Sequence, residues 1–206
     1  MYARTTTYQA RPEMVEPGIT YVRDAAIPMV EQIPGCIGQS MLVDRELGRC
    51  IVTAAWQSHR LMDASTQRVQ PMRDQAAEIL GANLVHEEWE IAVLHRDHPS
   101  QAGACARVTW MRAEPGRLEE AVRLYRTTML PAFEQEAGYC SASLFVDRDT
   151  ARLVSTVTFD SREALRRTRQ PAAPAPLNGS GQPSFEVVDV GEFELVLAHL
   201  HVPELD

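Results

Sequence analysis

The feature that most constrains this chain is an internal repeat. Residues 40–49 recur as residues 143–152, at an offset of 103 positions, with five of the ten residues identical. The same offset aligns residues 3–58 with residues 106–161 without a gap, and 18 of these 56 positions are identical. This identity is far above chance for a chain aligned with itself, so the protein is expected to contain two copies of one structural unit.

Each copy carries the same order of predicted elements. In the first copy, a β-branched and aromatic run over residues 3–10 predicts a strand, and apolar residues three or four apart over residues 13–33 predict a helix. Strands at residues 38–44 and 49–56 form a predicted hairpin. After the N-cap Ser58, a second helix is expected to run to about residue 80 with a break near Pro71, before a strand at residues 86–95. The order β-α-β-β-α-β is the ferredoxin-like split unit.

Such a unit places both helices on one face of its sheet, and the other face must be covered. Two copies can cover these faces against each other. We therefore predict an α+β fold in which two tandem ferredoxin-like units pack as an intramolecular dimeric α/β barrel. The expected boundaries are residues 1–96 for the first unit, 97–103 for a polar linker and 104–206 for the second unit. Residues 171–184, rich in proline and glycine, are expected to form a flexible loop.

Composition and charge exclude several classes of partner. The net charge of −8 disfavours nucleic acid, which an acidic surface repels. No apolar run approaches the roughly 20 residues of a membrane helix. The polar N-terminus lacks the apolar core of a signal peptide, so a cytoplasmic location is expected. None of the four cysteines forms a Cys-x-x-Cys pair, and all four are expected to be free thiols.

Charged residues on two predicted strands suggest cross-strand ion pairs. Arg4 and Arg107 occupy equivalent positions on the first strand of each copy, which neighbours the fourth strand in a split unit. One side of the fourth strands carries four acidic residues, Glu88, Glu90, Glu192 and Glu194. We predict Arg–Glu pairs on the face between the two halves, in the barrel interior, with Arg4, Arg107, Glu90 and Glu194 as candidates. These pairs serve either structure or a charged substrate, and no metal site is expected.

Three sequence features together suggest a family. They are the helix end Pro-Met-Val-Glu-Gln-Ile-Pro-Gly at residues 28–35, the Val-Asp-Arg hairpin at residues 43–45, and a strand that runs into Trp56-Gln57-Ser58. With these features the chain resembles the antibiotic biosynthesis monooxygenase family of the dimeric α/β-barrel superfamily. The resemblance implies a cavity between sheet and helices in each unit. Members of that family include cofactor-free oxygenases of aromatic polyketides and haem-degrading enzymes, and others have no assigned activity.

Aromatic residues near the implied cavities are the candidate ligand contacts. They are Thr7 and Trp110 on the first strands, Trp56 and Phe159 at the ends of the third strands, and Tyr125 on a helix of the second copy. Trp56 and Phe159 fit a core position as well as a pocket wall. The second copy is expected to hold the more apolar cavity. An apolar concave site with few polar groups suits a small hydrophobic or aromatic molecule.

Three functional hypotheses follow. The first is oxidation of a small aromatic or polyketide-like molecule without a cofactor, and the second is a non-catalytic small-molecule-binding or stress-response barrel protein. The third, haem binding or degradation, departs from the family pattern of an asparagine on the first strand with a tryptophan and a histidine on the second helix. Thr7 and Ser65 stand at the first two positions, and His59 at the very start is the only histidine of that helix. No catalytic residue is assigned, and the expected assembly is a monomer with an internal pseudo-dimer or a homodimer.

Overall fold

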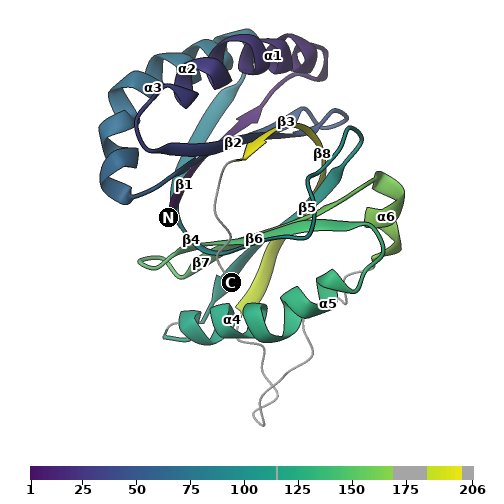
Figure 1. The fold of residues 1–206 in the computed structure, drawn as a ribbon. Coiled ribbons are helices and arrows are strands. Elements are labelled where there is room, and N and C mark those ends of the chain that lie inside the picture. The colour runs from purple at the N-terminus through teal and green to yellow at the C-terminus, as the bar shows by residue number, and fades with distance from the viewer. Residues whose placement is uncertain (115, 169–184, 201–206) are drawn as a thin grey trace. The chain divides into compact units, whose positions relative to one another are not determined.

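A computed structural model describes residues 1–114, 116–168 and 185–200 (Figure 1). The first repeat forms β1 (Tyr2–Gln9), η1 (Pro12–Met14), α1 (Val15–Tyr21), η2 (Val22–Ala26), α2 (Ile27–Glu31), β2 (Cys36–Asp44), β3 (Arg49–Trp56), α3 (His59–Leu80) and β4 (Asn83–Arg96). The second repeat forms β5 (Cys105–Ala113), α4 (Leu118–Leu124), η3 (Tyr125–Met129), α5 (Leu130–Glu134), β6 (Tyr139–Asp147), β7 (Arg152–Phe159), α6 (Arg162–Arg167) and β8 (Phe185–Leu200). The expected loop at residues 171–184 lies outside the described residues.

The hydrogen-bonded order of the strands is closed and reads β1-β3-β2-β8-β5-β7-β6-β4. Two β-α-β-β-α-β repeats with this closed antiparallel order confirm the predicted fold class, a tandem ferredoxin-like α/β barrel. Contacts divide the described chain into unit 1, which contains Met1–Trp89 and β8 from Glu194 onward, and unit 2, which contains Glu90–Phe193.

The unit boundaries fall inside β4 and β8. The boundary expected from the sequence is the linker at residues 97–103. Both strands are long, with 14 and 16 residues. From Glu90 onward β4 pairs with β6 of the second repeat. From Glu194 onward β8 pairs with β2 of the first repeat, with Glu194 opposite Val43. Each unit therefore contains the end of the other repeat's fourth strand.

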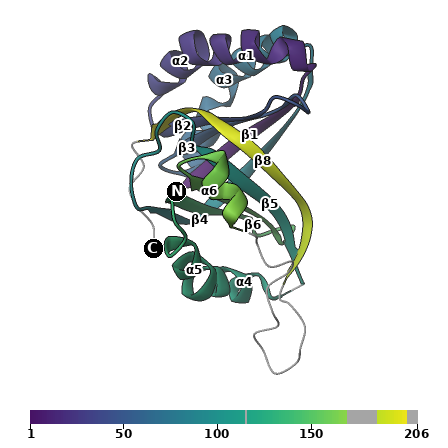
Figure 2. The ribbon, with the colours of Figure 1, turned by 90° about the vertical axis from the view of Figure 1, so that its right-hand side faces the viewer.

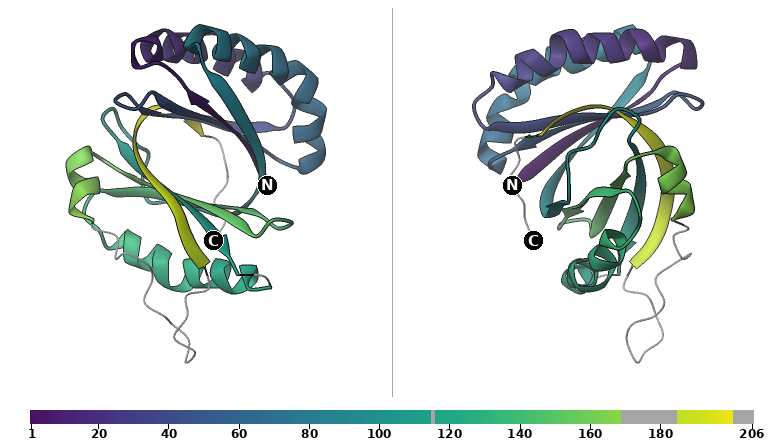
Figure 3. Two further views of the ribbon diagram at one scale, coloured as in Figure 1. Left: turned by 180° about the vertical axis from the view of Figure 1, so that it is seen from behind. Right: turned by 45° about the vertical axis from the view of Figure 1, so that its right-hand side comes forward.

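In unit 1, the helices α1, α2 and α3 cover one face of the sheet (Figures 2 and 3). The strands alternate, so every second side chain faces these helices. Tyr8, Met41 and Cys50 from the sheet pack with Ile19 and Leu80 from the helices in one buried cluster. A second cluster contains Trp56, Met62 and Val69 near the start of α3.

Prolines shape the first helix of both repeats. Pro28 and Pro131 occupy equivalent positions, and each follows a π-helical turn, η2 or η3. In these turns the N–H groups of Ile27 and Leu130 donate to carbonyls five residues earlier, those of Val22 and Tyr125. A proline inside an α-helix removes one hydrogen bond and its ring clashes with the carbonyl four residues earlier, and a wider turn relieves that clash.

The expected break at Pro71 is wrong. Helix α3 is continuous over His59–Leu80 with Pro71 inside it. Its buried residues, which include Met62, Val69 and Ala76, recur at helical spacing and pack on the sheet. Pro71 itself is exposed, on the opposite side. Packing along a helix of this length compensates for the roughly 3 kcal/mol that an interior proline costs. Ser58 caps the helix as predicted, by accepting a hydrogen bond from the Leu61 N–H at 3.3 Å.

The two β-hairpins close in the same way. The carboxylates of Asp44 and Asp147 accept backbone N–H groups of the turns that follow them. At the equivalent turn positions, Gly48 has φ +68° and Ala151 has φ +55°. Their carbonyls accept equivalent hydrogen bonds at 2.8 Å, from Ala10 and Ala113. The repeats thus place a glycine and an alanine in one left-handed conformation.

We predict that exchanging these two residues changes stability in opposite directions. Ala151→Gly is expected to raise the free energy of unfolding by about 0.5–1 kcal/mol. The left-handed conformation costs a non-glycine residue about 1–2 kcal/mol, and the greater conformational entropy of glycine in the unfolded state offsets part of the gain. Gly48→Ala is expected to lower it by about 2 kcal/mol, since a Cβ there would also overlap the Ala10 carbonyl oxygen. Urea unfolding of both variants provides the test, and an unchanged midpoint for Gly48→Ala would contradict it.

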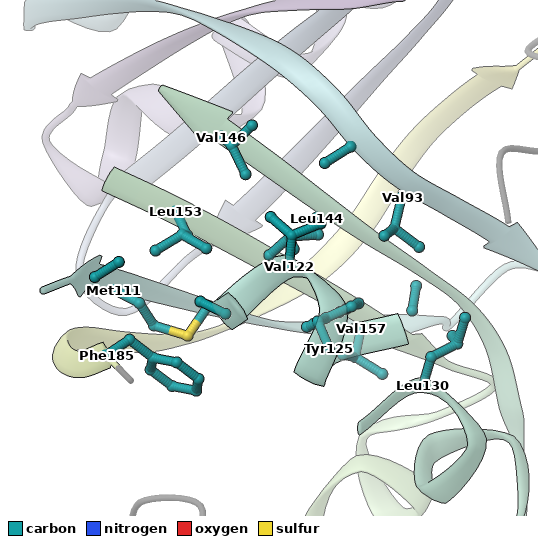
Figure 4. Close-up of a cluster of buried hydrophobic side chains, with 14 of the residues drawn as sticks. Val93, Met111, Val122, Tyr125, Leu130, Leu144, Val146, Leu153, Val157 and Phe185 are labelled. Carbon is teal, nitrogen blue, oxygen red and sulfur yellow. The ribbon is translucent and has the colours of Figure 1, made fainter. Parts of the chain in front are cut away.

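Unit 2 contains its own hydrophobic core between its sheet and the helices α4 and α5 (Figure 4). Tyr125, Val122 and Leu130 from the helical segment meet Leu144 from β6 and Val157 from β7. Tyr125 and Phe159 are each 1% exposed. All four cysteines of the chain are free thiols. None of the helices in the described part of the chain has the length and apolar character needed to cross a membrane.

Candidate functional site

The candidate site is a cavity inside unit 1, between the sheet and its covering helices. Its volume is about 50 Å³. The helical wall consists mainly of small apolar side chains, among them Val22, Ala26 and Val30 from η2 and α2. The sheet contributes Thr6 and Tyr8 from β1, together with Val52, Ala54 and Trp56 from β3. Small wall residues leave space here, in a place where ferredoxin-like units normally have a packed core.

Two buried donors at this cavity lack hydrogen-bond partners. Trp56 is fully buried and Arg73 of α3 is 9% exposed. Within the described residues, neither the Trp56 Nε1–H nor the Arg73 Nη1 group finds an acceptor. Leaving a buried donor unpaired costs about 1–3 kcal/mol, and more for a charged group, so native structures rarely contain such groups. Two of them at one cavity indicate that acceptor atoms, from water or from a ligand, belong there.

The charge of Arg73 is also uncompensated nearby. Among the residues that the structure describes, no carboxylate lies within ion-pair distance of its guanidinium. Burial, followed by the neighbouring charge of Arg4, lowers the pKa of Arg73 from its ordinary value, whereas the more distant charges of Asp74 and Glu88 act in the opposite direction. The charged residues of the described cavity walls are the two arginines, Arg4 and Arg73.

Arg4 lines the same cavity, but its hydrogen bonds are satisfied. Its guanidinium donates to the Glu88 carboxylate at 2.6 Å and to the hydroxyls of Ser65 and Thr66 at 3.1 and 2.9 Å. It also donates to the carbonyl of Met62 at 3.1 Å. Arg4 thereby joins β1 to β4 and α3, and its charge is matched by Glu88. Tyr8 also lines the cavity and its hydroxyl lies 3.5 Å from the Arg73 carbonyl oxygen, and burial raises the pKa of this hydroxyl well above the ordinary value.

The equivalent residue of unit 2 repeats this arrangement. Arg107 pairs with Glu192 at 2.8 Å and donates to the carbonyls of Thr168 and Leu165 at 2.7 and 3.2 Å. The structure thus places both predicted arginines in cross-strand pairs with a fourth-strand glutamate. It also corrects their location, because both bind α3 or the α6 segment and so lie on the helix-covered side of their sheets. Strand alternation puts Arg4 on the same side as Thr6 and Tyr8.

Glu90 and Glu194 take partners other than the predicted ones. Glu90 pairs with Arg148 at 2.6 Å, and Glu194 pairs with Arg45 at 2.8 Å. The hydrogen bond from Arg148 lowers the pKa of Glu90. Both arginines belong to the hairpin turns that follow β2 and β6. These glutamates stand two residues beyond Glu88 and Glu192 and so meet the hairpin of the neighbouring strand pair.

The second repeat fills the equivalent space with larger side chains. Tyr125, Met129 and Phe133 stand at the positions of Val22, Ala26 and Val30. The Tyr125 hydroxyl bonds with the Ser155 hydroxyl at 3.0 Å and donates to the Ser143 carbonyl at 3.2 Å, and its ring packs edge-on against Phe133. Tyr125, labelled in Figure 4, therefore belongs to the core of unit 2, and so does Phe159. This corrects the expectation that they line the more apolar cavity.

The remaining candidates from the sequence divide between the two faces of the sheets. Trp56 lines the cavity of unit 1. Thr7 and Trp110 alternate with the helix-facing residues of β1 and β5 and so lie on the other face. Trp110 packs edge-on against Phe193 with ring centroids 6.3 Å apart. Sequence reasoning missed Arg73. The one signal for it is its spacing, because Arg73 stands at helical spacing from the buried residues Val69 and Ala76 of α3.

Two groups of side chains outside the cavity have the composition of metal ligands. They are His98, Cys140 and Asp160 in unit 2, and His59, Asp63 and Glu88 in unit 1. In the second group, Arg4 already neutralises Glu88. In the first, His98 bridges Asp160 and Asp97 at 3.0 and 2.8 Å, and its hydrogen bonds to the carboxylate of Asp160 and then to that of Asp97 raise the pKa of His98. Neither group contributes to the cavity walls.

Solved structures with the same fold include several enzymes and enzyme-like proteins. A monooxygenase candidate from Lactobacillus acidophilus matches with a TM-score of 0.70 and 13% identity, over 100% of this chain and 99% of that one. An anthrone oxidase-like protein matches with a TM-score of 0.64 and 14% identity, over 99% and 94%. The heme-degrading enzyme LmHde from Listeria monocytogenes matches with a TM-score of 0.52 and 10% identity, over 94% and 99%. At these identities the similarity shows the fold.

Sequence comparison gives closer relatives. No family model matches the chain. The uncharacterized protein Rv2558 of Mycobacterium tuberculosis is 48% identical over the whole chain, which covers 87% of that protein. The uncharacterized protein Rv2557 of the same organism is 46% identical over the whole chain, which covers 92% of that protein. The chain therefore belongs to the same family as the Mycobacterium tuberculosis proteins Rv2557 and Rv2558.

Proposed function

We propose that this protein binds a small aromatic molecule in the cavity of unit 1 and oxidises it with molecular oxygen, without a cofactor. The observation that carries the proposal is the pair of unpartnered donors, Trp56 Nε1 and Arg73 Nη1, at an otherwise mainly apolar cavity. A ligand pocket typically combines apolar walls with a few placed polar groups. The monooxygenase-like and anthrone oxidase-like structures with this fold support an oxidative activity.

The chemistry needs a substrate that supplies its own electrons. In the simplest balanced case, a ring-activated CH₂ group and O₂ give C=O and H₂O. When water or hydroxide takes a proton from this CH₂ group, the negative charge is spread onto a conjugated oxygen of the substrate. Donors aimed at that oxygen stabilise the anion. Arg73 and Trp56 are suited to that role, and the apolar wall formed by Val22 and Val30 is suited to the ring.

Oxygen uptake tests this function. With single-ring hydroxylated aromatics that carry a ring-activated CH₂ group, the wild-type protein is expected to consume one O₂ per carbonyl formed. Trp56→Phe removes the N–H but keeps a large ring, and it is expected to lower kcat by about 100–1,000-fold, as loss of one oxyanion donor does elsewhere. Wild-type uptake no faster than that of the substrates alone would contradict the proposal. Equal rates for wild type and variant would remove Trp56 from the mechanism.

A non-catalytic binding protein is the second candidate, favoured by one observation. The described cavity walls contain Tyr8 as a candidate proton acceptor, but burial raises its pKa and so keeps it protonated. A binding protein needs no base. Haem is disfavoured because no histidine is among the described wall residues and a cavity of about 50 Å³ is far below haem size.

A further inference from the structure

We infer that the ligand of the unit 1 cavity is a single-ring aromatic anion, a carboxylate or an ionised acidic hydroxyl, whose charge Arg73 compensates. The inference deepens the proposed function by naming the class of ligand. It rests on the cavity proposed there as the binding site, and it does not depend on the oxidation step.

The sign of the ligand charge follows from the two arginines of the cavity. Glu88 matches Arg4 at 2.6 Å, whereas Arg73 has no such partner among the described residues. An isolated buried cation is costly, and a partner of opposite charge removes that cost. A carboxylate or phenolate oxygen also accepts hydrogen bonds from an arginine and from an indole N–H at the same time. An amide or a neutral alcohol would satisfy the donors but leave the charge uncompensated.

The size of the ligand follows from the cavity. A volume of about 50 Å³ is well below the roughly 300–1,000 Å³ of pockets for drug-sized ligands. The volume is also below the roughly 150 Å³ of an engineered cavity that binds benzene. A single ring therefore enters only if wall side chains move, and Met72 is suited to this because methionine is flexible. Fused ring systems would require the helices to separate from the sheet. The cavity therefore favours one ring over two or three.

The second repeat supports the same conclusion by contrast. Phe159 replaces Trp56 and carries no N–H donor, and Tyr125 occupies the space that Val22 leaves open. The Tyr125 hydroxyl has its own partners within unit 2. Within the described residues, unpaired donors and open space thus occur together in unit 1.

Isothermal titration at pH 7 and constant ionic strength tests the inference with benzoate and benzamide, which differ in charge but little in shape. Wild-type protein is expected to bind benzoate at least tenfold more tightly than benzamide. Arg73→Gln is expected to abolish that preference, while Arg73→Lys retains part of it. Arg68→Gln is the matched control, because it removes an exposed arginine of the same helix, and the preference is expected to persist. Thermal unfolding verifies that each variant is folded.

Each result separates the inference from the proposed function. Equal affinity for benzoate and benzamide would overturn the anion assignment and leave oxidation of a neutral aromatic intact. Tighter binding of naphthalene-2-carboxylate than of benzoate would overturn the single-ring assignment. Selective benzoate binding without oxygen uptake for any hydroxylated aromatic would support the inference and refute the oxidase. A benzoate preference that Arg73→Gln leaves unchanged would overturn the role of Arg73.

Discussion

Replacing Tyr125 by valine, the residue at the equivalent position of the first repeat, is expected to lower the free energy of unfolding by about 3 kcal/mol. The ring is 1% exposed and lies in the core of unit 2, where it contacts Phe133. Its removal leaves a cavity and leaves the Ser155 hydroxyl without its 3.0 Å partner. Both the lost burial and the unpaired hydroxyl destabilise the folded state.

Urea unfolding measures this change, and Tyr125→Phe serves as the control. Phenylalanine keeps the ring and loses only the hydroxyl, so we expect a cost of about 1 kcal/mol. A loss below about 1 kcal/mol for Tyr125→Val would mean that the site collapses around the smaller side chain. That result would contradict the view that Tyr125 fills space which unit 1 leaves open.

The reverse exchange in unit 1 is expected to abolish ligand binding. Val22→Phe with Val30→Phe introduces rings where the second repeat has Tyr125 and Phe133, and both valines line the cavity. Position 22 receives phenylalanine and not tyrosine. In the second repeat the Tyr125 hydroxyl bonds with Ser155, and the first repeat has Val52 at that position, which offers no partner. The two rings add more volume than the cavity of about 50 Å³ offers, so a stability cost of about 1–3 kcal/mol from overpacking is expected.

Titration with benzoate measures the loss of affinity. The Kd of the double variant is expected to be at least 100-fold higher than that of the wild type, or about 2.8 kcal/mol in binding free energy. Val85→Phe is the matched control, since this valine of β4 is 61% exposed and lies outside the cavity. Its affinity is expected to equal that of the wild type. Retained binding in the double variant, with the fold intact, would place the ligand elsewhere in the protein.

The local elements of the fold followed from the sequence because local signals specify them. The repeat, the alternation of the strands, the caps at Ser58 and Ser161 and the aspartates of the hairpins each depend on residues close together in the chain. The pairing of Arg4 and Arg107 with fourth-strand glutamates followed from topology. The continuity of α3 through Pro71 did not, because packing against the sheet outweighs the local preference of a proline.

The candidate site depended on contacts that no local pattern encodes. The sequence placed Trp56 near a cavity, but it pointed to Thr7 on the wrong face of β1 and to the second repeat as the more open unit. The cavity occurs in the first repeat because the side chains of its first helical segment are smaller. Val22, Ala26 and Val30 stand there at the positions of Tyr125, Met129 and Phe133 in the second repeat.

By itself, the sequence determined that two ferredoxin-like units occur in tandem. Hydrophobic periodicity and turn residues are local properties of a sequence, and both repeats carry them in the same order. Tertiary structure alone decided that β4 and β8 each contribute to both units, and that Trp56 and Arg73 are buried without acceptors. Burial and hydrogen-bond satisfaction depend on every neighbour of an atom in space. Those neighbours come from segments far apart in the chain, so their effect emerges only when the whole unit has folded.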